Sequence, residues 1–240
     1  MDKFHLAERE CVAKAIEVAA ASPDLGTLYR AIRDYDGHEL AAGRNYTPSQ
    51  VTDHESPIMI VTEKPEDEDR TQGRPFSGEY GTIMRNAAGL VGIDLDACHI
   101  AYAIHWTPED EKSPNKTQIA ASRPFLYREI ELVKPRVILA QGRAVIESLA
   151  HYRGSVLEIY GQTMNFRHGD IDVQMYMTAH PAYCMYSGTY FSTFVDNLRE
   201  FFSRHGDADE QTSPGSYEQK TSVHAQGDLT FKSIKEMKAA

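Results

Sequence analysis

One stretch of the chain indicates the fold directly: residues 137–150 read VILAQGRAVIESLA. Its first part, Val137 to Ala140, is an unbroken apolar run, as is typical of a strand that is buried on both faces. Gly142 ends that run, and Arg143 to Ala150 then follows the helical repeat of apolar positions. A strand followed at once by a helix is the repeating unit of an α/β sheet.

Similar units lie on both sides of this stretch. Apolar runs at Ile58 to Val61, His99 to Ile104 and Val173 to Thr178 predict three further strands. Apolar residues at helical spacing predict helices in the ranges 4–21, 80–91, 119–133 and 191–202. Strands that alternate with helices predict an α/β domain of three layers, α/β/α, around a central, mainly parallel four-stranded sheet.

The domain organisation follows from length and local composition. A chain of 240 residues can form one substantial core with appendages. We expect an N-terminal helix within residues 1–29, one catalytic-sized domain over 30–204, and a flexible C-terminal tail over 205–240, where the sequence becomes polar. Within the domain, residues 34–56 are rich in Gly, Asn, Asp and Ser and predict a long loop. Residues 231–237 could form a short helix in the tail.

Composition limits the possible partners. The net charge of −10 argues against a protein that coats nucleic acid by bulk electrostatics, although it leaves room for a local basic rim. No apolar stretch reaches the length of a membrane span, and the first ten residues are too charged for a secretory signal, so we expect a cytoplasmic protein without a membrane partner. Cys11, Cys98 and Cys184 are widely spaced, which predicts neither a disulfide framework nor a metal site.

Three loops that follow predicted strands contain unusual residues. They cover residues 62–78, 105–115 and 179–182. Because the carboxyl ends of parallel strands lie at one edge of a sheet, we expect these loops to converge there and to form the functional site.

An ordered set of short motifs runs through these loops and the helices after them. Residues 61–65 read VTEKP, 73–81 read GRPFSGEYG, 123–126 read RPFL, 134–144 read KPRVILAQGRA, and 180–182 read HPA. In order and spacing this set resembles family-4 uracil-DNA glycosylases and their phage DNA-polymerase-associated relatives, over roughly residues 39–199. The resemblance implies that superfamily's fold and hydrolysis of the bond between a base and deoxyribose in single- or double-stranded DNA, after base flipping.

The motif positions imply roles for five residues. Glu63 would orient or deprotonate the attacking water, and His180 would stabilise the departing base anion. Phe76 would stack on the base, while Tyr102 and Asp69 would line the base pocket. Simpler readings stay open for three of them: Glu63 as a loop acid beside the acidic run 66–69, which is normally solvated; Phe76 as a core residue; and His180 as a loop cap.

Basic residues in nearby loops are candidates for contact with DNA phosphates, and ordinary solvated side chains are the alternative. These candidates are Arg70, Arg74, Lys112, Lys116 and Arg167. The loop at 181–187, with its Tyr and Met side chains, is a candidate for insertion into the space that a flipped base leaves, or else a packed loop.

The chain departs from the resembled family at its iron–sulfur cluster. That family holds a [4Fe–4S] cluster with four Cys, whose positions correspond here to Tyr35, His38, Trp106 and Ser122. We therefore predict a protein without this cluster, in which packing holds the loops and Trp106 with Tyr35 fills the space. No other cofactor is expected.

The base pocket departs as well. Tyr102 stands where the family has an Asn that reads the pyrimidine edge, and Thr62 and Glu66 replace two glycines. The leading hypothesis is a DNA glycosylase that acts on uracil or another altered base. The alternatives are a catalytically drifted, non-enzymatic member of the fold that binds DNA or protein, and an enzyme that handles modified bases without excision.

Overall fold

The computed structural model describes residues 3–43, 46–51, 57–107, 113–152 and 154–205. A five-stranded sheet with the order β2-β1-β3-β5-β4 forms its middle layer. Its strands are β1 (Ile58–Thr62), β2 (His99–Tyr102), β3 (Val137–Gln141), β4 (Thr163–His168) and β5 (Ile171–Thr178). β1, β2, β3 and β5 pair in parallel, and β4 pairs antiparallel with β5 at one edge, so the prediction of a mainly parallel sheet is confirmed.

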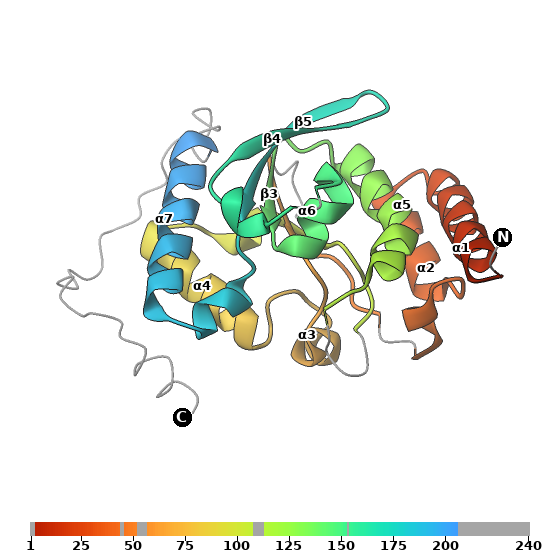
Figure 1. The fold of residues 1–240 in the computed structure, drawn as a ribbon, viewed down its shortest axis with the longest axis horizontal. Helices are drawn as coiled ribbons and strands as arrows, with labels where there is room; N and C mark the ends of the chain where they lie inside the picture. The colour runs from red at the N-terminus through yellow and green to blue at the C-terminus, as the bar shows by residue number, and fades with distance from the viewer. Residues whose placement is uncertain (1–2, 44–45, 52–56, 108–112, 153, 206–240) are drawn as a thin grey trace.

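Helices cover both faces of this sheet (Figure 1). They are α1 (Lys3–Ala20), α2 (Leu25–Asp34), α3 (Asp67–Gln72), α4 (Glu79–Val91), α5 (Lys116–Val133), α6 (Arg143–Ala150) and α7 (Gly188–His205), with short 3-10 helices η1 (Glu39–Gly43), η2 (Leu95–Ala97), η3 (Val156–Glu158) and η4 (Pro181–Met185). One core cluster packs α4 and α7 on one face, and a second packs α5 and α6 on the other. The predicted three-layer α/β/α architecture is therefore confirmed, with α1 and α2 packed outside α5.

The alternation of side chains along the strands explains the two cores. Ile58 and Ile60 of β1 face the α4 and α7 side, while Met59 and Val61 face the α5 and α6 side. All five residues of β1 and of β3 are buried, which is why the first four residues of each strand form an unbroken apolar run.

The prediction of four strands was one too few. The additional strand, β4, lies at the edge of the sheet and buries only Phe166, so its sequence has no apolar run. Its pairing with β5 comes from a tight hairpin around Gly169, whose φ is +54°.

Two helices were not expected. α2 buries only Leu28 and Ile32, four positions apart, and so gives a short periodic signal. α3 lies inside a segment predicted to be a loop. The predicted loop at 34–56 contains η1 and two isolated bridges, Tyr46 to Trp106 and Gln50 to Ile100, in its described part. The tail at 205–240 and its possible helix at 231–237 lie, from residue 206 onward, outside the described residues. No helix among the described residues has the length and apolar character to cross a bilayer.

Candidate functional site

The carboxyl ends of β1, β3 and β5 bring the first and third predicted loops to one edge of the sheet. β3 lies between β1 and β5, and the N–H of Gly142, just after β3, donates a hydrogen bond to the carbonyl of Thr178 at 2.9 Å. At the end of β2, the N–H of Ile104 donates to the carbonyl of Glu63 at 3.0 Å. Glu63 and His180 therefore lie at the same edge, which is where parallel sheets place their sites.

Glu63 is held at the N-terminus of α6. Its Oε1 accepts a hydrogen bond from the N–H of Ala144 at 2.9 Å, in the first turn of that helix. This bond fixes the direction of the carboxylate at the helix N-terminus. The second oxygen, Oε2, accepts no hydrogen bond from another of the described residues. Glu63 is thus a partly buried, oriented acid rather than a freely solvated one.

Gly142 makes this placement possible. Its φ is +91°, a conformation that side chains rarely adopt, and a Cβ at this position would lie 2.6 Å from Oε1 of Glu63. The glycine between β3 and α6 therefore lets the carboxylate approach the helix.

His180 is buried and electrically neutral. Its Nδ1 accepts a hydrogen bond from the N–H of Ala182 at 3.2 Å, so the ring proton lies on Nε2. Burial lowers the pKa of His180 below its ordinary value, which keeps the imidazole uncharged at pH 7. The ring of Tyr80 meets the His180 ring edge to face, with centroids 5.3 Å apart. The site thus contains a neutral imidazole that can donate a hydrogen bond from Nε2.

The acidic run at 66–69 is only half solvated, contrary to expectation. α3 turns Glu66 and Asp69 inward, where they are 8% and 2% exposed, while Asp67 and Glu68 point to solvent. Asp69 accepts three hydrogen bonds: from the N–H of Ser77 at 2.6 Å, the N–H of Glu66 at 3.1 Å and the Tyr102 hydroxyl at 3.1 Å. Asp69 therefore fixes the shape of the loop.

Glu66 fastens the same loop to α4. Its carboxylate accepts hydrogen bonds from the N–H groups of Tyr80 at 3.1 Å and Gly81 at 3.3 Å, both in the first turn of α4. Burial raises the pKa of Glu66 to about 7, against the opposing effect of these backbone hydrogen bonds. The residue that replaces a family glycine thus acts as a buried cap.

Tyr102 is completely buried, and its hydroxyl donates to Asp69. Burial, together with the charge of Asp69, raises the pKa of Tyr102 well above its ordinary value, so it remains a neutral phenol. The side chain at the position of the family's Asn is therefore already engaged within the protein.

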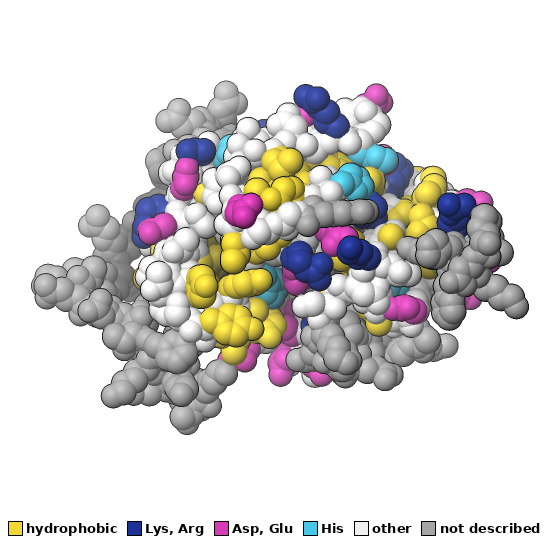
Figure 2. Space-filling model, viewed as in Figure 1, with side chains coloured by type: hydrophobic (Ala, Val, Ile, Leu, Met, Phe, Trp, Pro, Cys, Tyr) yellow, Lys and Arg dark blue, Asp and Glu magenta, His cyan; other side chains and the backbone are white. Residues whose placement is uncertain are grey.

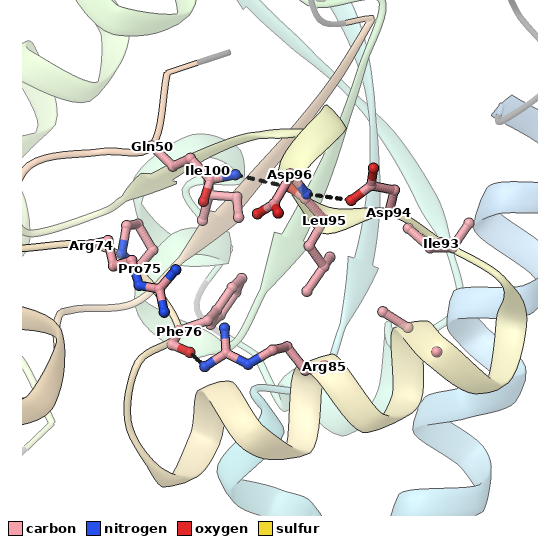
Figure 3. A pocket seen from close by; sticks show the side chains of 12 residues that line it. Gln50, Arg74, Pro75, Phe76, Arg85, Ile93, Asp94, Leu95, Asp96 and Ile100 are labelled. Carbon is pink, nitrogen blue, oxygen red and sulfur yellow. Dashed lines mark hydrogen bonds between the residues drawn. The ribbon is translucent and has the colours of Figure 1, made fainter. Parts of the chain in front are cut away.

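Phe76 is held in a strained turn. Its φ is +56°, its carbonyl accepts a hydrogen bond from the Arg85 guanidinium, and Gly81 packs so closely that no Cβ would fit. The ring is 4% exposed and lines a cavity of about 230 Å³ together with Pro75 and Ile100 (Figure 3). Neither Glu63 nor His180 is among the described residues that line this cavity, so the structure does not gather all the predicted site residues in one pocket.

Three of the candidate basic residues are exposed near these loops. Arg70 lies on α3 and forms an ion pair with Asp67 at 3.5 Å. Arg74 lines the cavity beside Phe76, and Lys116 is the first residue of α5.

The other two are placed differently. Arg167 lies in β4 and forms an ion pair at 2.9 Å with Asp172, near the start of β5. His180 follows the end of β5, roughly 20 Å away at strand geometry, so Arg167 is not at the site edge. Lys112 lies outside the described residues.

The four positions aligned with cluster ligands come together in space. The rings of His38 and Trp106 stack with centroids 4.6 Å apart, Nε2 of His38 lies 3.0 Å from the Ser122 hydroxyl, and Tyr35 lies 6.3 Å from Trp106. All four are buried, and as predicted Trp106 and Tyr35 fill the space. A [4Fe–4S] cluster needs thiolate ligands, so this donor set does not fit it. In the described part of the chain, no group of three or more His, Cys, Asp or Glu is arranged to hold a metal ion.

Three residues at the site were missed from the sequence. Tyr80 could have been noticed, because it stands where the resembled block GRPFVGxAG has Ala. Tyr160 is half-buried, and burial raises its pKa, with smaller contributions from the charges of Tyr183 and Glu63. Ala144 is the third: its N–H donates to Glu63, which lies 81 positions earlier in the chain, so no local sequence signal could have revealed this contact.

Comparison with known proteins identifies a family for this chain. The family model of the Uracil DNA glycosylase superfamily matches residues 48–201. The Type-4 uracil-DNA glycosylase of Pyrobaculum aerophilum is 26% identical over 183 residues, which cover 75% of this chain and 93% of that protein. The Type-4 uracil-DNA glycosylase of Sulfurisphaera tokodaii is 24% identical over 54% of this chain and 61% of its own length. A DNA polymerase of Bacillus phage SP01 is 26% identical over 44% of this chain and 12% of the polymerase.

Proposed function

Because the chain belongs to the uracil-DNA glycosylase superfamily, we propose that it is a DNA glycosylase, a hydrolase that cleaves the N-glycosidic bond of uracil or another altered base in DNA. One observation carries the proposal: an oriented carboxylate and a neutral imidazole, Glu63 and His180, lie at the same edge of the sheet. Base excision needs these two groups on opposite sides of the bond that breaks.

The reaction assigns each of these residues one task. Water forms a bond to C1′ of the sugar, the bond from C1′ to the base nitrogen breaks, and the electron pair leaves with the base. Oε2 of Glu63 orients the water or accepts its proton, while Oε1 stays bound to Ala144. The Nε2–H of His180 donates a hydrogen bond to an oxygen of the departing anion, as a neutral imidazole can do without losing its proton.

The base that is accepted depends on Tyr102 and Phe76 in this proposal. A phenol hydroxyl that is already bonded to Asp69 offers no paired donor and acceptor for a pyrimidine edge. We therefore propose that selectivity is shifted away from unmodified uracil. The reaction needs water and side chains alone, without a cofactor, and Arg70, Arg74 and Lys116 are the candidates for phosphate contact.

The test is a panel of oligonucleotides that contain uracil, hydroxymethyluracil, hypoxanthine or a thymine mismatch, each incubated with the purified protein as a single strand and as a duplex. Abasic sites are detected by alkaline cleavage. At least one base should be excised. An undamaged oligonucleotide of the same sequence is the control.

A second function is favoured by one observation. Tyr102 is completely buried and bonded to Asp69, which matches a pocket that has closed in a non-enzymatic, DNA- or protein-binding member of the fold. DNA binding without excision of any base in the panel would support this second function over the first.

A further inference from the structure

Four tyrosines gather beside the proposed site. The ring of Tyr183 lies at their centre, with centroids 6.1 Å from Tyr186, 6.4 Å from Tyr190 and 6.4 Å from Tyr160, each at a steep angle. They come from η4, the start of α7 and the turn before β4. Figure 2 shows hydrophobic side chains gathered on the face turned to the viewer, between α6 and α7 as labelled in Figure 1. We call these four residues the tyrosine cluster.

Two rings of the tyrosine cluster are exposed, and backbone hydrogen bonds hold the segments that carry them. Tyr186 is 74% exposed and Tyr190 is 45% exposed, whereas Cys184, two positions before Tyr186, is fully buried in the core. The N–H of Tyr186 donates a hydrogen bond to the carbonyl of Tyr183 at 3.1 Å. The N–H of Tyr190 donates a hydrogen bond to the carbonyl of Ser187 at 3.2 Å. Rings on a fixed backbone lose little conformational entropy when a ligand binds them.

The tyrosine cluster is continuous with the site. η4 begins directly after His180, and the N–H of Tyr183 donates to the carbonyl of His180 at 3.0 Å. On its other side, Tyr160 lies close enough to Glu63 for that charge to contribute to its raised pKa. The tyrosine cluster is therefore joined to His180 through the backbone of Tyr183.

We propose that the tyrosine cluster is a stacking platform for unpaired bases beside the target nucleotide, and that the substrate class is single-stranded DNA. This inference rests on the proposed function, because that function places the target nucleotide at Glu63 and His180. The faces of bases are free to stack on tyrosine only when the bases are unpaired, and such stacking tolerates any base. With a net charge of −10, the chain gains less from phosphate contacts than a basic protein does, so stacking has to supply more of the affinity.

The geometry favours a platform over a wedge. The segment at 181–187 was a candidate for insertion into a duplex, but η4 is a helical turn, and Tyr183 packs against three other rings. The surface it presents is broad, with Tyr186 and Tyr190 at its most exposed points.

The experiment measures binding of the full chain to an undamaged, labelled oligonucleotide of mixed sequence by fluorescence anisotropy, as a single strand and as a blunt duplex. The single strand should bind at least about 10-fold more tightly. Tyr186→Ala and Tyr190→Ala should each weaken single-strand binding by about 5-fold or more. Tyr186→Phe keeps the ring and should stay within about 2-fold. Ile16→Ala is the matched control, because Ile16 is 54% exposed on α1 and should leave binding unchanged.

The outcomes separate this inference from the proposed function, because undamaged DNA tests binding without turnover. Equal or tighter binding of the duplex, together with no effect of Tyr186→Ala, overturns the platform even if a base is excised. Loss of single-strand binding in Tyr186→Ala supports the platform even if no base in the panel is excised, a result that would count against the glycosylase alone. The tyrosine cluster could instead bind a second copy of this protein. Self-association that Tyr186→Ala abolishes, without binding of DNA, would also overturn the platform.

Discussion

The carboxylate of Glu63 accepts a hydrogen bond at 2.9 Å from the backbone N–H of Ala144, a residue that lies 81 positions further along the chain. This bond ties the end of β1 to the first turn of α6 across β3. It turns an acid of a surface loop into a carboxylate with a fixed direction, and the first prediction concerns the glycine that permits it.

Replacing Gly142 with Ala should displace Glu63, because the new Cβ would lie 2.6 Å from its Oε1 at a φ of +91°. We expect a loss of about 1–3 kcal/mol in the free energy of unfolding and a fall in base excision of about 100-fold. Gly89→Ala is the control: nothing lies within 4 Å of that position in α4, so stability should stay or rise. Urea denaturation and single-turnover excision measure both effects, and an unchanged Gly142→Ala variant would contradict the close contact.

Glu63→Gln and His180→Ala should each reduce turnover by about 100-fold or more, because each removes one preorganised group that acts on the reacting atoms. DNA affinity should change little, since most of it comes from contacts outside the reaction centre. Glu68→Gln, an exposed acid on α3, is the matched control and should retain full activity. If excision survives both site substitutions, the proposed mechanism is wrong.

Tyr102→Asn should raise uracil excision relative to the other bases of the panel, because it restores an amide with a donor and an acceptor. The change also removes a fully buried ring and its bond to Asp69, so we expect a loss of about 2–4 kcal/mol in stability. Tyr102→Phe removes the hydroxyl alone and separates the two effects. Identical base preferences of Tyr102→Asn and wild type would show that Tyr102 does not set selectivity.

Glu66 should make stability fall as the pH rises. Its pKa is raised from 4.5 to about 7 in the folded protein, so the folded state holds the proton more tightly than the unfolded state does. The contribution is fully present below about pH 4.5 and is lost as the pH rises through about 7; in total it is on the order of 3 kcal/mol. Glu66→Gln mimics the protonated form and should flatten this dependence. The test is to measure the free energy of unfolding of wild type and of Glu66→Gln between pH 5 and pH 8. The same pH dependence in both proteins would contradict the raised pKa of Glu66.

The purified protein should show no absorbance near 400 nm and contain no stoichiometric iron, because the positions of the cluster ligands are occupied by Tyr35, His38, Trp106 and Ser122. Trp106→Ala should lower the free energy of unfolding by about 3–5 kcal/mol, since it removes a fully buried ring from a packed cluster. Anaerobic purification and metal analysis check the first point, and denaturation checks the second. Stoichiometric iron would show that the alignment of these segments is wrong.

Burial on both faces made most of the sheet predictable. The first four residues of β1 and of β3 are apolar, and Gly142 marks the turn into α6. β4 escaped prediction because only Phe166 is buried in it. The sequence motifs also singled out Glu63 and His180, which the fold brings to one edge of the sheet.

The arrangement around these two residues could not be predicted in the same way. A run of acidic residues such as 66–69 is normally solvated, but Glu66 and Asp69 are turned inward at the start of α3. The contact of Tyr80 with His180 joins residues 100 positions apart and depends on how α4 packs against η4. Local patterns identify which residues carry chemistry, while the contacts that orient them arise from packing over long sequence distances.

The stacking of His38 on Trp106 changes what this domain needs from its surroundings. A fold whose loops are joined by an inorganic cluster depends on metal delivery and assembly proteins, and it weakens when oxygen attacks the cluster. Here the stacked rings of His38 and Trp106 stand at the positions of those ligands, so we expect the stability of this domain to be independent of iron supply.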